Sequence, residues 1–149
     1  MTDLLCLEHR ETRAREFGAT DTVNSGDPDW KDQVMALTDG VDVAIEAVGM
    51  PETFTMATIL VRPGGNLTYI GVHGRTVDLA LNELWIKNID ISMGPINTNT
   101  MAMLLPLVAE HKLPADTFVI HEFSFDQMME AYDVLGHAAD HHAVKVLIH

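Results

Sequence analysis

Residues 41–49, which read Val41-Asp42-Val43-Ala44-Ile45-Glu46-Ala47-Val48-Gly49, decide the fold class. Valine, alanine and isoleucine dominate this run, and a glycine ends it. A mostly apolar run of this length is typical of a strand that is covered on both faces, and such strands belong to parallel sheets. We therefore predict a buried strand of a parallel sheet over Val41–Val48.

Predicted strands and helices alternate on both sides of this run. Short apolar runs bounded by turn residues indicate strands, and apolar residues at helical spacing indicate helices. The other predicted strands are Leu4–Leu7, Leu67–Val72, a segment that ends near Gly94, and Val144–Ile148, and short extended segments are predicted at Thr22–Val23 and Phe118–Ile120. The predicted helical or amphipathic segments are Glu8–Phe17, Asp29–Thr38, Phe54–Val61, Thr100–His111 and Phe125–Leu135. This alternation predicts an α/β, doubly wound parallel sheet, in which ligands lie beyond the carboxyl ends of the strands.

Composition restricts the partners of the chain. The 149 residues include 9 Lys and Arg against 22 Asp and Glu, and the formal net charge is -13. This charge repels phosphate backbones and anionic headgroups, so we expect no nucleic-acid partner and no membrane surface. The single cysteine, Cys6, excludes an internal disulfide and any zinc site that needs two or more thiolates. The first residues do not form a secretion signal, so we expect a cytoplasmic location.

Several blocks of the sequence recur in the same order in one enzyme family. They are Arg15–Thr20, Val41–Gly49, Arg62–Gly65 and Tyr69–Val72, followed by Val119–Phe125 and Ala143–Ile148. In these blocks the chain resembles the carboxyl-terminal part of the zinc-dependent, medium-chain alcohol dehydrogenases. The resemblance implies a partial dinucleotide-binding, Rossmann-like domain over residues 1–117. It also implies that residues 118–149 are the segment that in the family returns to the catalytic domain.

Two features of that family do not occur in this sequence. The dinucleotide fingerprint G-x-G-x-x-G, which follows the first strand in the family, is absent from the 149 residues. The domain that carries the catalytic zinc ligands is also absent, and one cysteine cannot replace those ligands. The resemblance therefore implies a Rossmann-like sheet that lacks its first strand and Gly-rich loop. We expect this chain to be inactive by itself.

The resemblance also implies a function and its cofactors. Intact relatives transfer hydride between an alcohol or ketone and NAD or NADP, with zinc as a Lewis acid. We therefore expect an alcohol dehydrogenase-like oxidoreductase fragment. The acidic residue that would bind the adenosine ribose falls at Leu5, so the choice between NAD and NADP stays open. A noncatalytic nucleotide-binding or assembly module, from a different class, is the alternative.

Ten residues are the candidates for cofactor binding that the resemblance implies, and no catalytic or metal-binding residue is predicted. Ala47, Val48 and Gly49 would line the adenosine side, and Ile70, Gly71 and Val72 would face the nicotinamide. Pro95 and Ile96 would flank its carboxamide, Arg10 would contact the adenosine, and Lys145 would reach phosphate. Ordinary packing at strand ends is the alternative for the apolar residues, and exposed surface charges are the alternative for the two basic ones.

Histidines give two weaker hypotheses. His137 and His141 are four residues apart, a spacing that lets two side chains bind one divalent metal on a helix, so a histidine-based metal binder is a further alternative. His73 follows the Leu67–Val72 strand, where it could act as an acid or base. Because the sequence identifies no partner for His73, an ordinary loop histidine is the favoured interpretation.

Missing strand partners predict self-association. In the strand order 3-2-1-4-5-6 the first strand is central, so a sheet without it has two unpaired inner edges that recruit other strands. The related enzymes also pair their last nucleotide-domain strands across a two-fold axis, and Ile89–Met93 is the matching strand here. We therefore expect a homo-oligomer with Ile91 near the pairing edge.

Overall fold

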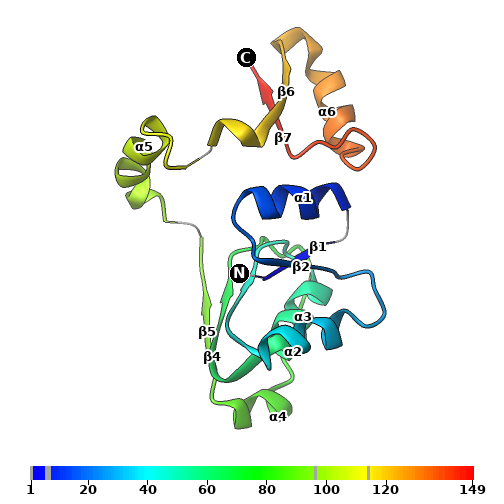
Figure 1. Ribbon diagram of the computed structural model, residues 1–149, viewed down its shortest axis with the longest axis vertical. Helices are drawn as coiled ribbons and strands as arrows, with labels where there is room; N and C mark the ends of the chain where they lie inside the picture. Colours follow the sequence, from blue (N-terminus) through cyan, green and yellow to red (C-terminus); the bar gives the residue numbers. More distant parts are fainter. Residues whose placement is uncertain (1, 6–7, 96, 114) are drawn as a thin grey trace. The chain divides into compact units, whose positions relative to one another are not determined.

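The computed structural model describes residues 2–5, 8–95, 97–113 and 115–149 (Figure 1). The chain forms two compact units. We call residues 23–97 the central unit, and residues 3–22 with 98–149 the terminal unit. No helix in the described part of the chain is long and apolar enough to cross a bilayer. The domain boundary at residue 117 that the resemblance implies stays a prediction.

A three-stranded parallel sheet forms the centre of the central unit. Its strands are β3 (Val41–Glu46), β4 (Val61–Tyr69) and β5 (Asp90–Met93), in the order β3-β4-β5. The helices of the unit are α2 (Trp30–Thr38), α3 (Pro51–Leu60), α4 (Leu81–Leu84) and the 3-10 helix Trp85–Lys87. Parallel strands joined through helices confirm the predicted α/β class.

The core of this unit lies between α3 and one face of the sheet. Phe54 and Ala57 on α3 pack with Ala44 on β3 and with Val61 and Leu67 on β4. Pro51 occupies the first turn of α3, where its missing N–H leaves no intrahelical hydrogen bond unmade. Because a right-handed crossover helix returns over the sheet between parallel strands, α3 covers the face that carries Ala44.

The prediction that the Val41–Val48 run is covered on both faces is wrong for the described structure. The strand ends at Glu46, and alternate residues point to opposite faces of the sheet. Val43 is 54% exposed and Ile45 is 65% exposed, whereas Ala44 and Glu46 are buried. Within the central unit α3 covers one face, and the apolar residues of the other face remain open.

Strand β4 begins earlier than the predicted Leu67–Val72 strand. Val41 pairs with Val61, and Val43 pairs with Asn66, so the register shifts and Arg62–Gly65 bulges from the ladder. Gly65 is required there, since a Cβ atom would lie 2.7 Å from Val61 Cγ2. Proline and glycine are tolerated in a strand at a bulge of this kind.

The terminal unit is built from both ends of the chain. It holds α1 (Glu8–Glu16), α5 (Met101–Ala109), β6 (Val119–Phe123), α6 (Met128–Gly136) and β7 (Lys145–Ile148). Short 3-10 helices occupy Thr98–Thr100, Ala115–Phe118 and Phe125–Gln127. Strands β6 and β7 pair in parallel, and α6 connects them. This is a β-α-β unit with the alternation that the sequence predicts.

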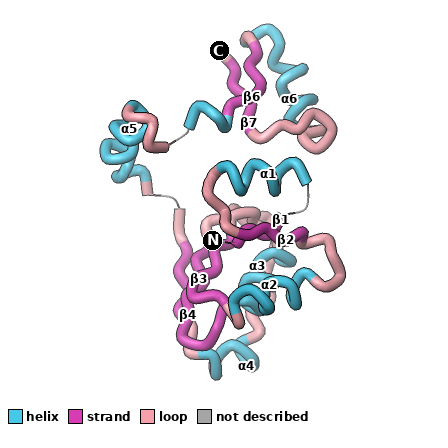
Figure 2. The backbone as a smooth tube through the Cα atoms, in the orientation of Figure 1, coloured by secondary structure: helices cyan, strands magenta, loops and turns pink. Residues whose placement is uncertain are grey.

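The strands of the chain belong to three separate hydrogen-bonded sheets (Figure 2). Strand β1 (Thr2–Leu5) pairs with β2 (Asp21–Asn24), apart from the β3-β4-β5 and β6-β7 sheets. The predicted Leu4–Leu7 strand is thus displaced to Thr2–Leu5, and Cys6 and Leu7 lie outside the described residues. In the described residues, one edge of β3 has no strand partner, as expected for a Rossmann-like sheet without its first strand.

Candidate functional site

A buried carboxylate stands at the carboxyl end of β3. Glu46 is 3% exposed. Its Oε1 accepts hydrogen bonds from the backbone N–H groups of Val48 and Gly49, both at 2.8 Å, and from Thr53 Oγ1 at 2.7 Å. Thr53 belongs to the first turn of α3. The carboxylate therefore ties the end of β3 to the loop after it and to the start of the next helix.

The environment of Glu46 keeps this carboxylate ionised. Burial by itself raises the pKa of the Glu46 carboxyl, because a charged group loses hydration in the interior. The hydrogen bonds from Thr53, Gly49, Val48 and His73 act in the opposite direction and together lower the pKa below its ordinary value of 4.5. Hydrogen-bond donors thus stabilise the ionised form, and no lysine or arginine among the described residues is paired with it.

His73 has the partner that the sequence did not identify. Its Nε2 lies 3.3 Å from Glu46 Oε2, and the two side chains are 7% and 1% exposed. The ring makes edge contacts with Tyr69, with centroids 4.5 Å apart, and with Phe54 at 6.2 Å. Sequence reasoning missed Glu46. Its signal was an acidic residue at the end of a mostly apolar strand, since acidic residues are almost never buried unless they are paired.

Two glycines bring the loops after β3 and β4 into contact. The N–H groups of Ile70 and Gly71 both donate to the Glu46 carbonyl, at 2.9 and 3.2 Å. A Cβ atom at Gly71 would lie 2.3 Å from the Gly49 nitrogen, and one at Gly49 would lie 2.4 Å from the Val72 carbonyl oxygen. Gly49 also has a φ of +88°, which strains other residues. The close approach that these glycines permit is therefore between the two loops.

Exposed apolar side chains surround this junction. Val48 is 66% exposed, Ile70 is 39% exposed and Val72 is 91% exposed, and Ala47 is exposed beside them. These residues stand at the carboxyl ends of neighbouring parallel strands, where ligands of α/β sheets lie. Pro95 is exposed two residues after β5, and Ile96 lies outside the described residues.

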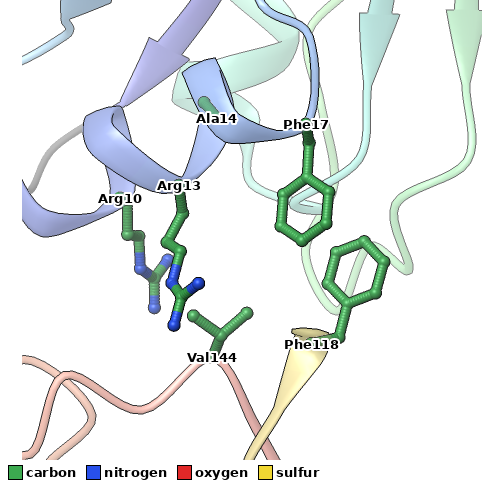
Figure 3. Close-up of a pocket in the computed structure, with 6 residues that line it drawn as sticks. All are labelled: Arg10, Arg13, Ala14, Phe17, Phe118 and Val144. Atoms are coloured by element: carbon green, nitrogen blue, oxygen red, sulfur yellow. The ribbon is translucent and has the colours of Figure 1, made fainter. Parts of the chain in front are cut away.

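Arg10 lies in a pocket of the terminal unit (Figure 3). The cavity has a volume of about 250 Å³ and is lined by Arg10, Arg13, Ala14, Phe17, Phe118 and Val144. The guanidinium groups of Arg10 and Arg13 extend from α1 toward Val144. Arg13 is paired with Glu16 at 2.9 Å. Lys145, the first residue of β7, is exposed next to Val144 in the sequence.

The histidines near the carboxyl terminus do not have the helical arrangement on which the alternative metal-binding hypothesis depends. Helix α6 ends at Gly136, so His137 and His141 do not share a helix and the spacing argument fails. His137 Nδ1 lies 3.2 Å from Asp133 Oδ1 and 3.0 Å from its backbone oxygen. Among the described residues there is no group of three or more His, Cys, Asp or Glu side chains that could hold a metal ion. The described side chains therefore do not fit the catalytic zinc of the related enzymes.

A parallel sheet with glycine-bounded loops at its carboxyl ends defines the class of a Rossmann-like nucleotide-binding domain. The family described as zinc-binding dehydrogenase matches residues 6–110, and the chain belongs to that family. An alcohol dehydrogenase from Cupriavidus necator is 30% identical over 139 residues, which are 89% of this chain and 38% of the relative.

Solved structures agree with this assignment. The zinc-dependent alcohol dehydrogenase 2 from Streptococcus pneumoniae, in its apo form, superposes with a TM-score of 0.93 and 41% identity over 99% of this chain and 43% of its own. A zinc-binding dehydrogenase from Sinorhizobium meliloti bound to NADP has a TM-score of 0.81 and 28% identity, over 99% of this chain and 44% of its own. The resemblance found in the sequence is thus confirmed, and the chain spans less than half the length of these relatives.

Proposed function

We propose that this chain is the cofactor-orienting part of an alcohol dehydrogenase that transfers hydride between an alcohol or ketone and NAD or NADP. Membership of the zinc-binding dehydrogenase family supports an oxidoreductase of this kind. The nicotinamide supplies the hydride chemistry when it is bound. The described residues contain no group of three or more potential metal ligands, so no step of the proposal uses the catalytic zinc.

The observation that carries the proposal is the apolar surface at the carboxyl ends of β3 and β4. Val48, Ile70 and Val72 expose apolar side chains there, on two loops that Glu46 holds together: its carboxylate accepts from the loop after β3 and its backbone carbonyl from the loop after β4. A flat aromatic ring gains free energy by covering such a surface, and a rigid surface keeps the ring in one orientation. We propose that Ala47, Val48 and Gly49 contact the adenosine side.

The remaining proposed contacts follow the resemblance. Ile70, Gly71 and Val72 face the nicotinamide, and Pro95 and Ile96 flank its carboxamide. In the terminal unit Arg10 contacts the adenosine, where its exposed guanidinium on α1 offers several hydrogen-bond donors, and Lys145 contacts phosphate.

Titration of the 149-residue chain with NADH tests this proposal. We expect shifts of the Gly49 and Gly71 amide signals in NMR spectra, with a dissociation constant weaker than micromolar, because the sequence has no G-x-G-x-x-G loop to hold the pyrophosphate. Val72→Asp should weaken binding, since it places a charge on the apolar surface. Leu37→Asp, at a half-exposed position on α2, is the control and should leave binding unchanged. Shifts confined to residues outside both loops would contradict the proposal.

We also propose a cytoplasmic homo-oligomer that pairs through β5. Strand β5 is an edge strand of the β3-β4-β5 sheet, and exposed edges promote association with another strand. Trp85 and Ile86, just before it, are each 73% exposed, and Met93 at its end is 68% exposed. A second copy that pairs along β5 would cover part of this apolar surface.

A further inference from the structure

The central unit contains a cavity that the proposed cofactor contacts do not line. Its volume is about 370 Å³. Phe54 from α3, Tyr69 from β4 and Ile91 from β5 form apolar walls, and the loop after β4 contributes Val77 and Leu79. An apolar cavity of roughly 150 Å³ is enough to bind benzene. The cavity therefore has room for an aromatic or branched aliphatic group with a substituent.

One unpaired cation lies on the wall of this cavity. Arg75 lines it and is exposed, so its charge lies where the cavity opens to solvent. Within the described residues Arg75 has no ion pair or hydrogen bond, whereas Arg62, on the same sheet, is bound to Asp42. The cavity thus combines an apolar interior with a free guanidinium at its opening.

A buried negative charge fixes the orientation of any anion in this cavity. The wall includes His73, whose Nε2 lies 3.3 Å from Oε2 of the Glu46 carboxylate, and Glu46 itself does not line the cavity. A second carboxylate placed at this depth would be repelled by Glu46 and would lose its hydration. A carboxylate at the opening can instead accept two hydrogen bonds from the planar guanidinium of Arg75 and remain partly hydrated.

We propose that this cavity binds a small monocarboxylate with an aromatic or branched apolar body. The apolar body lies between Phe54, Tyr69 and Ile91, and the carboxylate pairs with Arg75. This site is separate from the proposed cofactor contacts. The central unit would then bind an aromatic or branched-chain acid in addition to the cofactor.

Benzoate is the probe for this proposal, and benzamide, which has the same ring and no charge, is its neutral control. We expect benzoate to shift the methyl signals of Ile91, Val77 and Leu79 in ¹³C NMR spectra of the 149-residue chain, with millimolar affinity. Benzamide should bind roughly fivefold more weakly, because it cannot form the ion pair with Arg75, which contributes about as much free energy as an exposed salt bridge. The Arg75→Gln variant should remove this difference. Lys31→Gln, an exposed charge on α2, should preserve it.

Two further experiments test the proposal: a variant that fills the cavity, and a competition between benzoate and NADH. Leu79→Trp places a large ring in the cavity from an exposed position, so it should abolish the methyl shifts with both probes while tryptophan fluorescence verifies the fold. NADH should leave benzoate bound, and its displacement would assign the cavity to the cofactor and overturn the proposal. Equal binding of the two probes would also overturn it. So would sedimentation runs showing that benzoate causes dimer formation, if the methyl shifts follow the fraction of dimer. Failure of NADH to bind would refute the proposed function and leave this site standing.

Discussion

Replacement of Glu46 by glutamine tests the central argument about the site. Glutamine keeps the shape of the side chain and an oxygen acceptor, so it removes the charge without emptying the space. Three donors reach Oε1 at 2.7 to 2.8 Å. A hydrogen bond to a charged group contributes about 1 kcal/mol more than a neutral one. Since such bonds are not additive, we expect Glu46→Gln to lower the free energy of unfolding by about 2 kcal/mol at pH 7.

Urea unfolding followed by tryptophan fluorescence measures this change. Both tryptophans, Trp30 and Trp85, lie in the central unit, so the signal reports on the unit that contains Glu46. Asp42→Asn is the matched control, because it removes a carboxylate from an exposed ion pair with Arg62. The control should cost less than about 1 kcal/mol. Glu46→Ala, which leaves buried N–H groups without an acceptor, should cost about 4 kcal/mol.

The pH dependence of the same measurement gives a second, independent check. The pKa of Glu46 is lower in the folded chain than its ordinary value of 4.5. Its contribution to stability is therefore complete above pH 4.5 and is lost as the pH falls through the lowered folded pKa. The difference between the wild-type chain and Glu46→Gln should shrink on acidification below pH 4.5. A Glu46→Gln cost equal to that of Asp42→Asn, or a difference that grows with acid, would refute the reasoning.

Three further predictions concern activity, metals and assembly. The 149-residue chain should not oxidise alcohols with added NAD and zinc, because its described residues offer no metal site, and a chelator-sensitive formation of NADH would contradict this. Zinc or nickel should leave the melting temperature nearly unchanged, whereas a saturable rise that is lost in the double variant His137→Ala and His141→Ala would restore the metal-binding hypothesis. Sedimentation at micromolar concentration should detect a homo-oligomer that Ile91→Pro weakens, since proline cannot donate to a strand ladder, and a stable monomer would refute pairing through β5.

The order of strands and helices was readable from local patterns. Apolar runs that stop at glycine, such as Val41–Gly49, and helical spacing, as in Asp29–Thr38, depend on residues close in sequence, and both are found in the structure. Boundaries were less accurate where a tertiary contact decides them. Arg62–Gly65 has the composition of a turn, but pairing with β3 incorporates it into β4 as a bulge.

The sequence predicted where the candidate site lies in the sheet, but it did not predict the buried carboxylate and histidine that the site contains. The carboxyl ends of parallel strands were readable from the positions of Gly49 and Gly71. The contact of the Glu46 carboxylate with His73 was not, because His73 is 27 residues away and meets Glu46 only after β3 and β4 have paired. Sequence patterns carry no record of such a long-range contact.

By itself, the sequence determined the α/β class, the family and the region of the sheet where a ligand would lie, because periodicity and short motifs are local properties. Only the tertiary structure decided which face of β3 is covered, how the strands divide among three sheets, and that His73 contacts Glu46. These features depend on packing between segments that are distant in sequence. Burial costs the Glu46 carboxylate its hydration, and donors from the following loop, from α3 and from His73 replace the lost water.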